Sequence, residues 1–478
     1  LKVLYRLVMQ DSIVVEENRV YITQQHQEEE DTASMIARKL HERIPVLTIE
    51  KELEEAQEDL NITLSEQQKE AVRMVFANPI SIITGGPGTG KTTVLKIILY
   101  IYQKKCGNEV KLMAPTGRAA RRMAESTGSG DATTMHMALG LFGDGDYEAL
   151  IDELSADFIN VDEVSMVDMH LAYEFFYKVK AGARVLLVGD VHQLPSVGAG
   201  DVFRQLILCG KIPVTVLNLV YRQGKDSNIP INAQLINEGK TNLQWGDDFQ
   251  MVECSGADAA AQIVKNIYLK EIQMYGMEQV QILSPYKVRS AAGVLELNRS
   301  LQDEVNPPVS GKRELHLGSE IFREGDRILQ NKNTEFASNG DLGILVQIAE
   351  DEDNNPLVHI VFTDGRRVKY EAEQVEMIEH ANAITIHKSQ GSECQVVIIP
   401  WLKAFYPMLK RNIFYTGITR AKQRVYIVGE WKAVCQAIHT DDTGTRKTML
   451  AVKIQQYCER YQRQENRRIP ATICNRAV

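Results

Sequence analysis

The sequence lacks any long hydrophobic run. Among its 478 residues, the longest apolar stretch covers only residues 97–102, whereas a membrane-spanning helix needs about 20 apolar residues. The N-terminal stretch also lacks the basic-then-apolar layout of a secretory signal peptide. We therefore expect no membrane association and no secretion.

Cysteine is scarce and scattered. The chain has seven cysteines, and no two of them form a C-x-x-C pair. An odd, dispersed set argues against a disulfide framework and against a zinc or iron–sulfur site. This usage favours a reducing cytoplasm as the location of the protein.

The sequence also lacks a net positive charge. Its 54 Lys and Arg residues are outnumbered by 63 Asp and Glu residues, so the formal charge is −9. This excludes a protein that coats nucleic acid through bulk positive charge. It leaves open a narrow channel in which backbone amides and a few arginines hold a strand.

The chain begins with Leu1 rather than Met, which predicts a fragment that lacks part of an N-terminal region. Residues 1–60 are charge-rich, and we expect a helical remnant of a longer N-terminal domain. A short β element is predicted at 20–23 and a helix at 31–40. The acidic clusters at 28–31 and 50–59 are typical of solvated helix faces.

From residue 61 onward, short apolar strands alternate with helices. Such alternation predicts an α/β fold with parallel sheets covered on both faces. We expect one sheet in residues 61–245 and a second in residues 246–317 and 379–445, followed by a C-terminal tail at 446–478. The strands are predicted at 80–84, 110–114, 158–161, 185–188 and 214–217, then at 280–284, 384–386, 396–399 and 425–428.

Residues 318–378 have a different texture. Short alternating strands are predicted at 327–330, 343–348, 357–362 and 367–370. Their connections include Asn339-Gly340 and Asp364-Gly365, which suit tight turns between antiparallel strands. We therefore predict a small antiparallel barrel inserted into the second α/β domain.

A phosphate-binding loop is the strongest local signal. The segment GGPGTGKTT at 85–93 contains G-x-x-x-x-G-K-[ST], directly after a predicted strand and before a helix. Glycines allow the backbone N–H groups to face phosphate, and the helix N-terminus adds partial positive charge. We expect Lys91 to reach the terminal phosphates of a nucleotide and Thr92 to bind Mg²⁺. The predicted nucleotide contacts in this loop are Gly86, Pro87, Gly88, Thr89, Gly90, Lys91, Thr92 and Thr93.

Polar residues follow two further strands of the first sheet. Asp162 and Glu163 end the strand at 158–161, where Asp162 would position Mg²⁺ and Glu163 would orient or deprotonate the attacking water. Gln193 follows the strand at 185–188 and could contact the terminal phosphate. Two arginines, Arg222 and Arg420, are candidates to stabilise charge in the transition state.

These motifs together resemble superfamily 1 helicases, and most closely the RecD-like branch of superfamily 1B, the RecD/TraA family. The branch rests chiefly on ITGGPGTGKTT, GDVHQLPSVGAGDVF and IHKSQGSE. The matching stretches occur in the order of the family and span residues 64–429: LSEQQKEAV (64–72), GGPGTGKTT (85–93), APTGRAA (114–120), ATTMHMALG (132–140), VDEVSMVD (161–168), VGDVHQLPSVGAGDVF (188–203), VYRQ (220–223), AITIHKSQGSE (383–393) and IFYTGITRAKQRVYIVG (413–429).

The resemblance implies two RecA-like lobes, with a β-hairpin pin at 139–157 in the first and an SH3-like barrel in the second. It also implies a nucleotide site in which Gln68 reads adenine, Tyr221 stacks on the base and Glu393 binds the ribose. Arg222 and Arg420 would approach the terminal phosphate from opposite lobes. The DNA contacts that the resemblance implies are Thr116, His136, Thr385 and His387. Arg118 and Arg121 are added because, at spacings of three and four, they share one helix face with Arg122 after a strand end, although a solvated helix face stays open as the alternative.

The resemblance further implies a DNA helicase that uses ATP and Mg²⁺, moves 5′ to 3′ on single-stranded DNA and opens duplex junctions in repair or recombination. We expect a monomer. The helicase part of a conjugative relaxase and a RecD subunit of a nuclease complex stay open as alternatives. So do a catalytically silent scaffold and a transporter-type ATPase, although the complete set of site residues disfavours the scaffold and the absence of an LSGGQ-like stretch disfavours the transporter.

Overall fold

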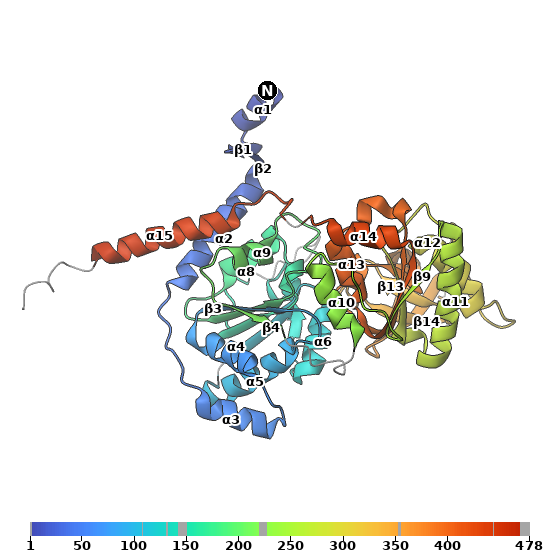
Figure 1. Ribbon diagram of the computed structural model, residues 1–478, viewed down its shortest axis with the longest axis horizontal. Coiled ribbons are helices and arrows are strands. Elements are labelled where there is room, and N and C mark those ends of the chain that lie inside the picture. Colours follow the sequence, from blue (N-terminus) through green and yellow to red (C-terminus); the bar gives the residue numbers. More distant parts are fainter. Residues whose placement is uncertain are drawn as a thin grey trace, which may run out of the picture.

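The computed structural model describes residues 2–107, 109–130, 132–141, 151–218, 227–351, 355–442 and 444–468. In these ranges the chain forms two α/β lobes side by side, and a small antiparallel β domain is inserted in the second (Figure 1). The predicted fold class is confirmed.

The first lobe is built on a six-stranded parallel sheet in the order β5-β4-β6-β7-β3-β8. The strands β3, β6 and β7 are buried from end to end, as expected for a sheet that is covered on both faces. Because all strands run in one direction, the loops that follow them meet at one edge. The strands are β3 (Ile80–Gly85), β4 (Val110–Ala114), β5 (Ala132–Thr134), β6 (Phe158–Val161), β7 (Arg184–Gly189) and β8 (Val214–Leu217).

Helices cover both faces of this sheet, and alternate residues of β3 point to each side. Ile83 shares a core with α3 (Glu50–Asp59), α4 (Glu66–Ala77), α5 (Lys91–Lys105) and α6 (Gly117–Thr127). Ile82 shares a core with α7 (Met135–Ala138), α8 (Met169–Lys178) and α9 (Val202–Leu208) on the other face. Helix α5, which follows the predicted phosphate loop, and helix α6 therefore cover the same face of the sheet.

The second lobe has a five-stranded parallel sheet in the order β18-β10-β19-β20-β9. Its strands are β9 (Phe249–Glu253), β10 (Val280–Ser284), β18 (Ala383–Thr385), β19 (Cys394–Trp401) and β20 (Ala421–Gly429). The helices around it are α11 (Ala257–Tyr275), α12 (Val294–Val305), α13 (Arg411–Ile418) and α14 (Trp431–His439).

Helix α10 (Asn228–Asn237) lies in a different lobe from the one that we expected. The sequence analysis assigned residues up to 245 to the first lobe, but Ile229, Ala233 and Ile236 are buried in the core of the second. The apolar face of a helix shows that it packs on something, but it does not show which of two sheets it covers. Residues 219–226, between β8 and α10 in the sequence, lie outside the described ranges.

The inserted unit is an antiparallel sheet in the order β16-β15-β14-β13-β17, preceded by the hairpin of β11 and β12. It extends slightly beyond the predicted range of 318–378 at both ends. Its own apolar core includes Ile328, Leu345, Val358 and Tyr370. The strands are β11 (Glu314–Leu317), β12 (Glu320–Arg323), β13 (Arg327–Gln330), β14 (Leu342–Glu350), β15 (Pro356–Phe362), β16 (Arg367–Glu371) and β17 (Ile378–His380).

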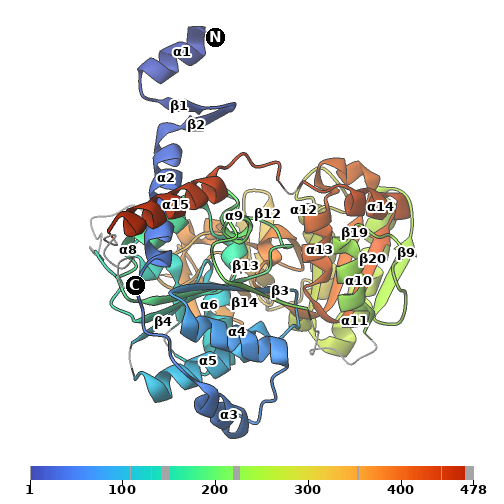
Figure 2. The ribbon, with the colours of Figure 1, turned by 60° about the vertical axis from the view of Figure 1, so that its left-hand side comes forward.

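One helix near each end of the described chain packs against the first lobe, and the two helices contact each other. Helix α2 (Thr23–Leu40) and helix α15 (Leu450–Arg468) share the core of the α8 face, although we expected a C-terminal tail at 446–478. Figures 1 and 2 both show α1 (Lys2–Met9) and the hairpin of β1 (Ile13–Glu16) and β2 (Arg19–Ile22) projecting away from the body. Among the described helices, none combines the length and the apolar character that a bilayer crossing requires.

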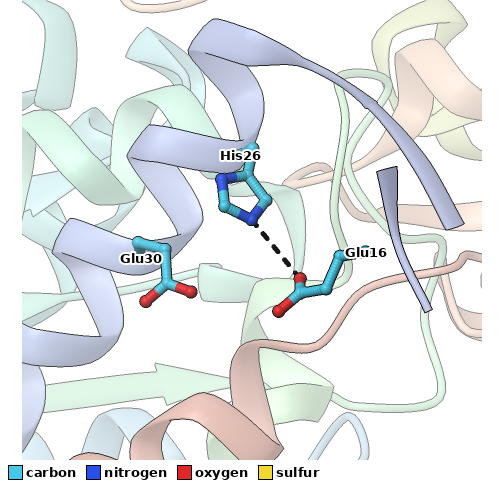
Figure 3. A group of neighbouring side chains, drawn as sticks. All are labelled: Glu16, His26 and Glu30. Carbon is cyan, nitrogen blue, oxygen red and sulfur yellow. Dashed lines mark ion pairs between the residues drawn. The ribbon is translucent and has the colours of Figure 1, made fainter. Parts of the chain in front are cut away.

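A buried lysine joins these two ends. The side chain of Lys453 on α15 is only 3 % exposed, and its Nζ lies 3.1 Å from Glu16, 3.4 Å from Glu29 and 3.0 Å from Glu30. Glu16 also forms an ion pair of 3.4 Å with His26, which Figure 3 shows beside Glu30. Glu16, His26 and Glu30 are spaced closely enough to share a metal ion, but the ammonium group already supplies a cation next to both carboxylates.

Replacing Lys453 with Met should loosen α15 from α2, because three carboxylates would lose their shared cation. Removing one partner of a buried ion pair costs on the order of 3 kcal/mol, which is roughly a hundredfold in an opening equilibrium. Hydrogen exchange of the α15 amides should therefore accelerate by about that factor. The exposed Lys447 is the matched control; if Lys453→Met exchanges no faster than Lys447→Met, the cluster does not hold the two ends together.

Candidate nucleotide site

A cavity of about 320 Å³ lies between the two lobes, at the edge where the first sheet ends. The first lobe contributes its phosphate-loop residues, one face of α6 and the ends of β6 and β7, and the second lobe contributes two short segments. The lining residues are Pro87, Gly88, Thr89, Gly90, Lys91, Thr92, Thr93, Ala119, Arg122, Met123, Ser126, Asp162, Glu163, Gln193, Gly391, Glu393 and Arg420.

The loop between β3 and α5 has the curled shape that a phosphate cradle requires. Gly88 and Gly90 adopt φ values of 75° and 87°, which glycine reaches without strain. Gly90 directly precedes the first turn of α5. The backbone N–H groups of that turn have no partner within the helix, so they can bind phosphate at this end of α5. The Nζ of Lys91 donates hydrogen bonds to the carbonyl oxygens of Gly85 at 2.6 Å and Gly86 at 3.0 Å.

Gln68 lies next to this loop, but its amide already has partners within the protein. Its Oε1 accepts a hydrogen bond from the backbone N–H of Ser65, which completes a capping box at the start of α4. Its Nε2 donates to the carbonyl of Thr89 at 3.3 Å. The described contacts therefore give Gln68 a supporting position beneath the loop, and adenine recognition by this residue stays a prediction.

Asp162 and Glu163 follow β6 and face the cavity from its floor. Glu163 has a left-handed φ of 51°, and its backbone N–H donates to Asp162 Oδ1 at 2.8 Å. Burial raises the pKa of Asp162, and burial together with the adjacent Asp162 raises the pKa of Glu163. Cations from both lobes oppose this shift of Glu163: Lys91 and Arg122 from the first and Arg420 from the second.

Gln193 lies at the end of the β7 loop, where the lobes are bonded together. Its Nε2 donates to Asp190 at 3.3 Å, and Asp190 accepts a 2.8 Å hydrogen bond from the hydroxyl of Tyr415 in the second lobe. The backbone N–H of Leu194 donates to the hydroxyl of Thr416 at 3.1 Å. The loop that carries Gln193 is therefore fastened to α13 across the cleft.

Arg420 enters the cavity from the second lobe, directly after α13, and is 3 % exposed. Its guanidinium donates to the carbonyl of Thr416 at 3.1 Å, the carbonyl of Ser392 at 3.3 Å and the hydroxyl of Thr419 at 3.2 Å. These three partners all belong to the second lobe.

Arg122 also lines the cavity, whereas the sequence analysis grouped it with the DNA-facing arginines. It forms an ion pair of 2.5 Å with Glu393, so it joins α6 of the first lobe to the second lobe. Burial alone would lower the pKa of the Arg122 guanidinium, but Glu393, Glu163 and Asp162 together raise it. Glu393 also lies 3.6 Å from Lys422. Ribose binding by Glu393 stays a prediction.

The other two arginines of α6 have separate surroundings. Arg121 pairs with Asp341 and with Asp364 of the inserted barrel, the latter at 3.1 Å. Arg118 is packed so that its Nη1 makes no hydrogen bond among the described residues, and burial lowers its pKa to about 10. A DNA strand that reached Arg121 would have to displace two acids.

The remaining predicted DNA residues come from both lobes. Thr116 caps α6 by accepting from the N–H of Ala119, and Thr385 accepts from the N–H of Lys388. His136 is exposed on α7. His387 begins a short 3₁₀ turn (His387–Ser389) and lines a second cavity between the lobes, of about 410 Å³.

Two predicted residues and the predicted pin cannot be placed. Tyr221 and Arg222 lie outside the described ranges, as do residues 142–150, which carry most of the hairpin expected at 139–157. Thr92 and Asp162, the expected Mg²⁺ ligands, line the same cavity. Their hydroxyl and carboxylate oxygens are the ligand types that Mg²⁺ prefers.

Models of known domain families match three parts of the chain. An AAA domain matches residues 63–257, an ATP-dependent RecD-like DNA helicase SH3 domain matches residues 297–362, and a UvrD-like helicase C-terminal domain matches residues 380–428. These ranges follow the first lobe, the inserted barrel and the part of the second lobe that carries Glu393 and Arg420.

Individual relatives agree with the domain matches. The chain is 34 % identical over 372 residues to the ATP-dependent RecD2 DNA helicase of Deinococcus radiodurans, covering 77 % of this chain and 50 % of that protein. It is 28 % identical over 433 residues to the RecBCD enzyme subunit RecD of Mycolicibacterium smegmatis, covering 80 % of this chain and 75 % of that protein. The chain therefore spans about half the length of the first of these relatives.

Among solved structures, the Pif1 helicase from Candida albicans superimposes with a TM-score of 0.48 and 18 % identity, covering 85 % of this chain and 100 % of that chain. This likeness is too weak to carry an argument.

Replacing Glu163 with Gln should make the protein more stable at neutral pH. Because the pKa of Glu163 lies above its ordinary value of 4.5, the folded protein binds this proton more tightly than the unfolded chain does. The stability contribution of the group is therefore complete below pH 4.5 and falls as the pH rises through the folded-state pKa. Gln carries no charge, so the gain should be present at neutral pH and disappear in acid.

Thermal unfolding at two pH values measures this effect, with roughly 2–4 °C expected per kcal/mol for domains of this size. The exposed Glu54 on α3 gives the matched control, Glu54→Gln. A Glu163→Gln protein that melts no higher than Glu54→Gln at neutral pH would show that the buried carboxylate is not under electrostatic strain.

Proposed function

This chain belongs to the RecD-like helicases, and from that premise we propose that it is an ATP-dependent DNA helicase. The observation that carries the proposal is the cavity between the lobes, because its wall combines a phosphate loop, two half-buried carboxylates and an arginine from the opposite lobe. A site that both lobes complete can convert a change in the bound nucleotide into a change in lobe position.

The residues of the cavity fit a nucleoside triphosphate with Mg²⁺. Backbone N–H groups around Gly88 and Gly90 and the ammonium of Lys91 suit the phosphates. Thr92 and Asp162 would hold Mg²⁺, which when bound neutralises phosphate charge. The raised pKa of Glu163 suits a carboxylate that takes up a proton from the attacking water, while Gln193 orients that water or contacts the terminal phosphate.

Arg420 would stabilise the charge that develops on the terminal phosphoryl group. It lies on the second lobe, so it reaches the phosphate only while the cleft is closed. Arg222, by resemblance, would act from the first lobe. Loss of the terminal phosphate removes the group that these residues share, and the lobes can then part.

A DNA strand held across both lobes would be moved by this opening and closing. We propose 5′-to-3′ movement on single-stranded DNA, supported by the RecD-like motifs, with contacts from Thr116, His136, Thr385 and His387. Arg118 and Arg121 would join them only after rearrangement of their present surroundings. Hydroxyl and backbone contacts to phosphate carry no sequence information, so binding should be largely independent of sequence.

A role in DNA repair or recombination, a cytoplasmic location and a monomeric state complete the proposal. The second candidate is a RecD-type subunit of a nuclease complex, which is favoured by the match to a relative named as a RecBCD enzyme subunit. The two differ in whether the chain unwinds DNA without other proteins, so strand displacement by the purified chain separates them.

Replacing Arg420 with Ala should lower kcat for ATP hydrolysis on single-stranded DNA by roughly 10³-fold or more, as expected for loss of an arginine finger. The KM for ATP should change far less, because the phosphate loop is intact. The exposed Arg463 on α15 provides the control Arg463→Ala. A kcat within a factor of about three of the control would contradict the assigned role of Arg420.

Direction of movement can be read from tailed duplexes. The purified protein with ATP and Mg²⁺ should displace the strand of a duplex that carries a 5′ single-stranded tail and leave a 3′-tailed duplex intact. Lys91→Ala, which removes the ammonium group of the phosphate loop, is the negative control. Displacement restricted to the 3′-tailed duplex would contradict the proposed direction, and displacement of neither would favour the subunit alternative.

A further inference from the structure

Helix α6 makes two contacts with one short loop of the second lobe, residues 390–394. The first is a close approach: Gly391 has a φ of 72°, and a β carbon at this position would lie 3.4 Å from Ala119 and 3.6 Å from Thr116. The second is the 2.5 Å ion pair between Arg122 and Glu393. Thr116, which caps α6, and Ala119 and Arg122 on α6 lie three residues apart and therefore meet the same loop.

This loop is also the support of Arg420. The carbonyl of Ser392 accepts a 3.3 Å hydrogen bond from Arg420 Nη1, and the N–H of Cys394 donates a 2.9 Å bond to the carbonyl of Arg420. Glu393, the residue between these two, is the one that Arg122 holds. A displacement of Glu393 would thus move the flanking groups that orient both the side chain and the backbone of Arg420.

The Arg122–Glu393 pair is the contact between this loop and the first lobe that lies between the two groups that hold Arg420. Gln390 of the loop makes another such contact, because its Nε2 donates a 3.0 Å hydrogen bond to the carbonyl of Leu194. The side chain of Glu393 is 8 % exposed, and its second cationic neighbour, Lys422 at 3.6 Å, belongs to the second lobe. Lys422 can neutralise Glu393, but it cannot tie Glu393 to α6. Arg122 therefore relates the position of Arg420 to the first lobe, where the phosphate loop lies, through the residue next to both groups that hold Arg420.

We propose that Arg122 is a positioning residue for hydrolysis, which acts through Glu393 to place Arg420 against the phosphate loop. This inference rests on the proposed function, since it gives Arg122 a task in the same cavity. It assigns to Arg122 the nucleotide cleft in place of the DNA surface. The effect of Arg122 should therefore depend on the presence of Arg420.

Binding of a fluorescent ADP derivative, with and without aluminium fluoride, tests this dependence. ADP alone lacks the terminal group, whereas ADP with aluminium fluoride imitates the phosphoryl group in transfer. Arg122→Met should weaken binding in the presence of aluminium fluoride by about tenfold, because a sub-ångström displacement of a catalytic group has effects of this order. Binding of ADP alone should stay within about twofold, since the phosphate loop is unchanged.

The variants give the inference its controls. Glu393→Gln should reproduce the loss from the other side of the pair, and Arg122→Lys should restore part of it, because an ammonium can still pair with Glu393. Arg73→Met removes an Arg–Glu pair that lies within the first lobe, away from the cleft, and should behave as wild type. In an Arg420→Ala background, Arg122→Met should cause less than about twofold further loss, because the two residues act as one unit.

The outcomes are distinct. If wild-type protein binds ADP no more tightly with aluminium fluoride, the proposed function fails and this inference fails with it. If aluminium fluoride tightens ADP binding by the wild-type protein and tightens it equally for Arg122→Met, this inference alone is overturned. A full tenfold loss from Arg122→Met in the Arg420→Ala background also overturns it, because Arg122 would then act independently.

Discussion

Two adjacent carboxylates, Asp162 and Glu163, are half-buried at the end of β6, and the rest of the site is arranged around that constraint. Burial raises the pKa of both Asp162 and Glu163, and the adjacent Asp162 carboxylate raises the pKa of Glu163 further. Neither lobe alone surrounds the pair, because Lys91 and Arg122 approach from the first lobe and Arg420 from the second. The charge balance of the pair therefore changes whenever the lobes or the bound phosphates move, and this links chemistry to movement.

Much of the fold could be predicted from the sequence. The strands β4, β6, β8, β10 and β13 have the bounds that the short apolar runs indicated. The phosphate loop and the residues after β6 and β7 were also found, since a strand, a glycine turn and a helix start form a local pattern. β5, β9 and β17 were missed because they are short or polar at the edge of a sheet.

Contacts between distant segments could not be predicted. The packing of α10 on the second lobe and of α15 on α2 depends on tertiary neighbours that periodicity does not identify. The three arginines of α6 share a spacing that indicated one face, but Arg121 meets the barrel, Arg122 the cleft and Arg118 a packed interior. Gln68 was identified as a site residue, but its capping of α4 became visible only with the fold.

The central claim is that a nucleotide bound between the lobes has its terminal phosphate against Arg420. A crystal structure of the protein with Mg²⁺, ADP and aluminium fluoride tests it most directly, through the distance from the guanidinium of Arg420 to the aluminium fluoride group. The account predicts hydrogen-bond contact, at about 3 Å, with the group seated on the loop around Lys91. A structure in which that group occupies the loop while the Arg420 guanidinium points away from it would contradict the account.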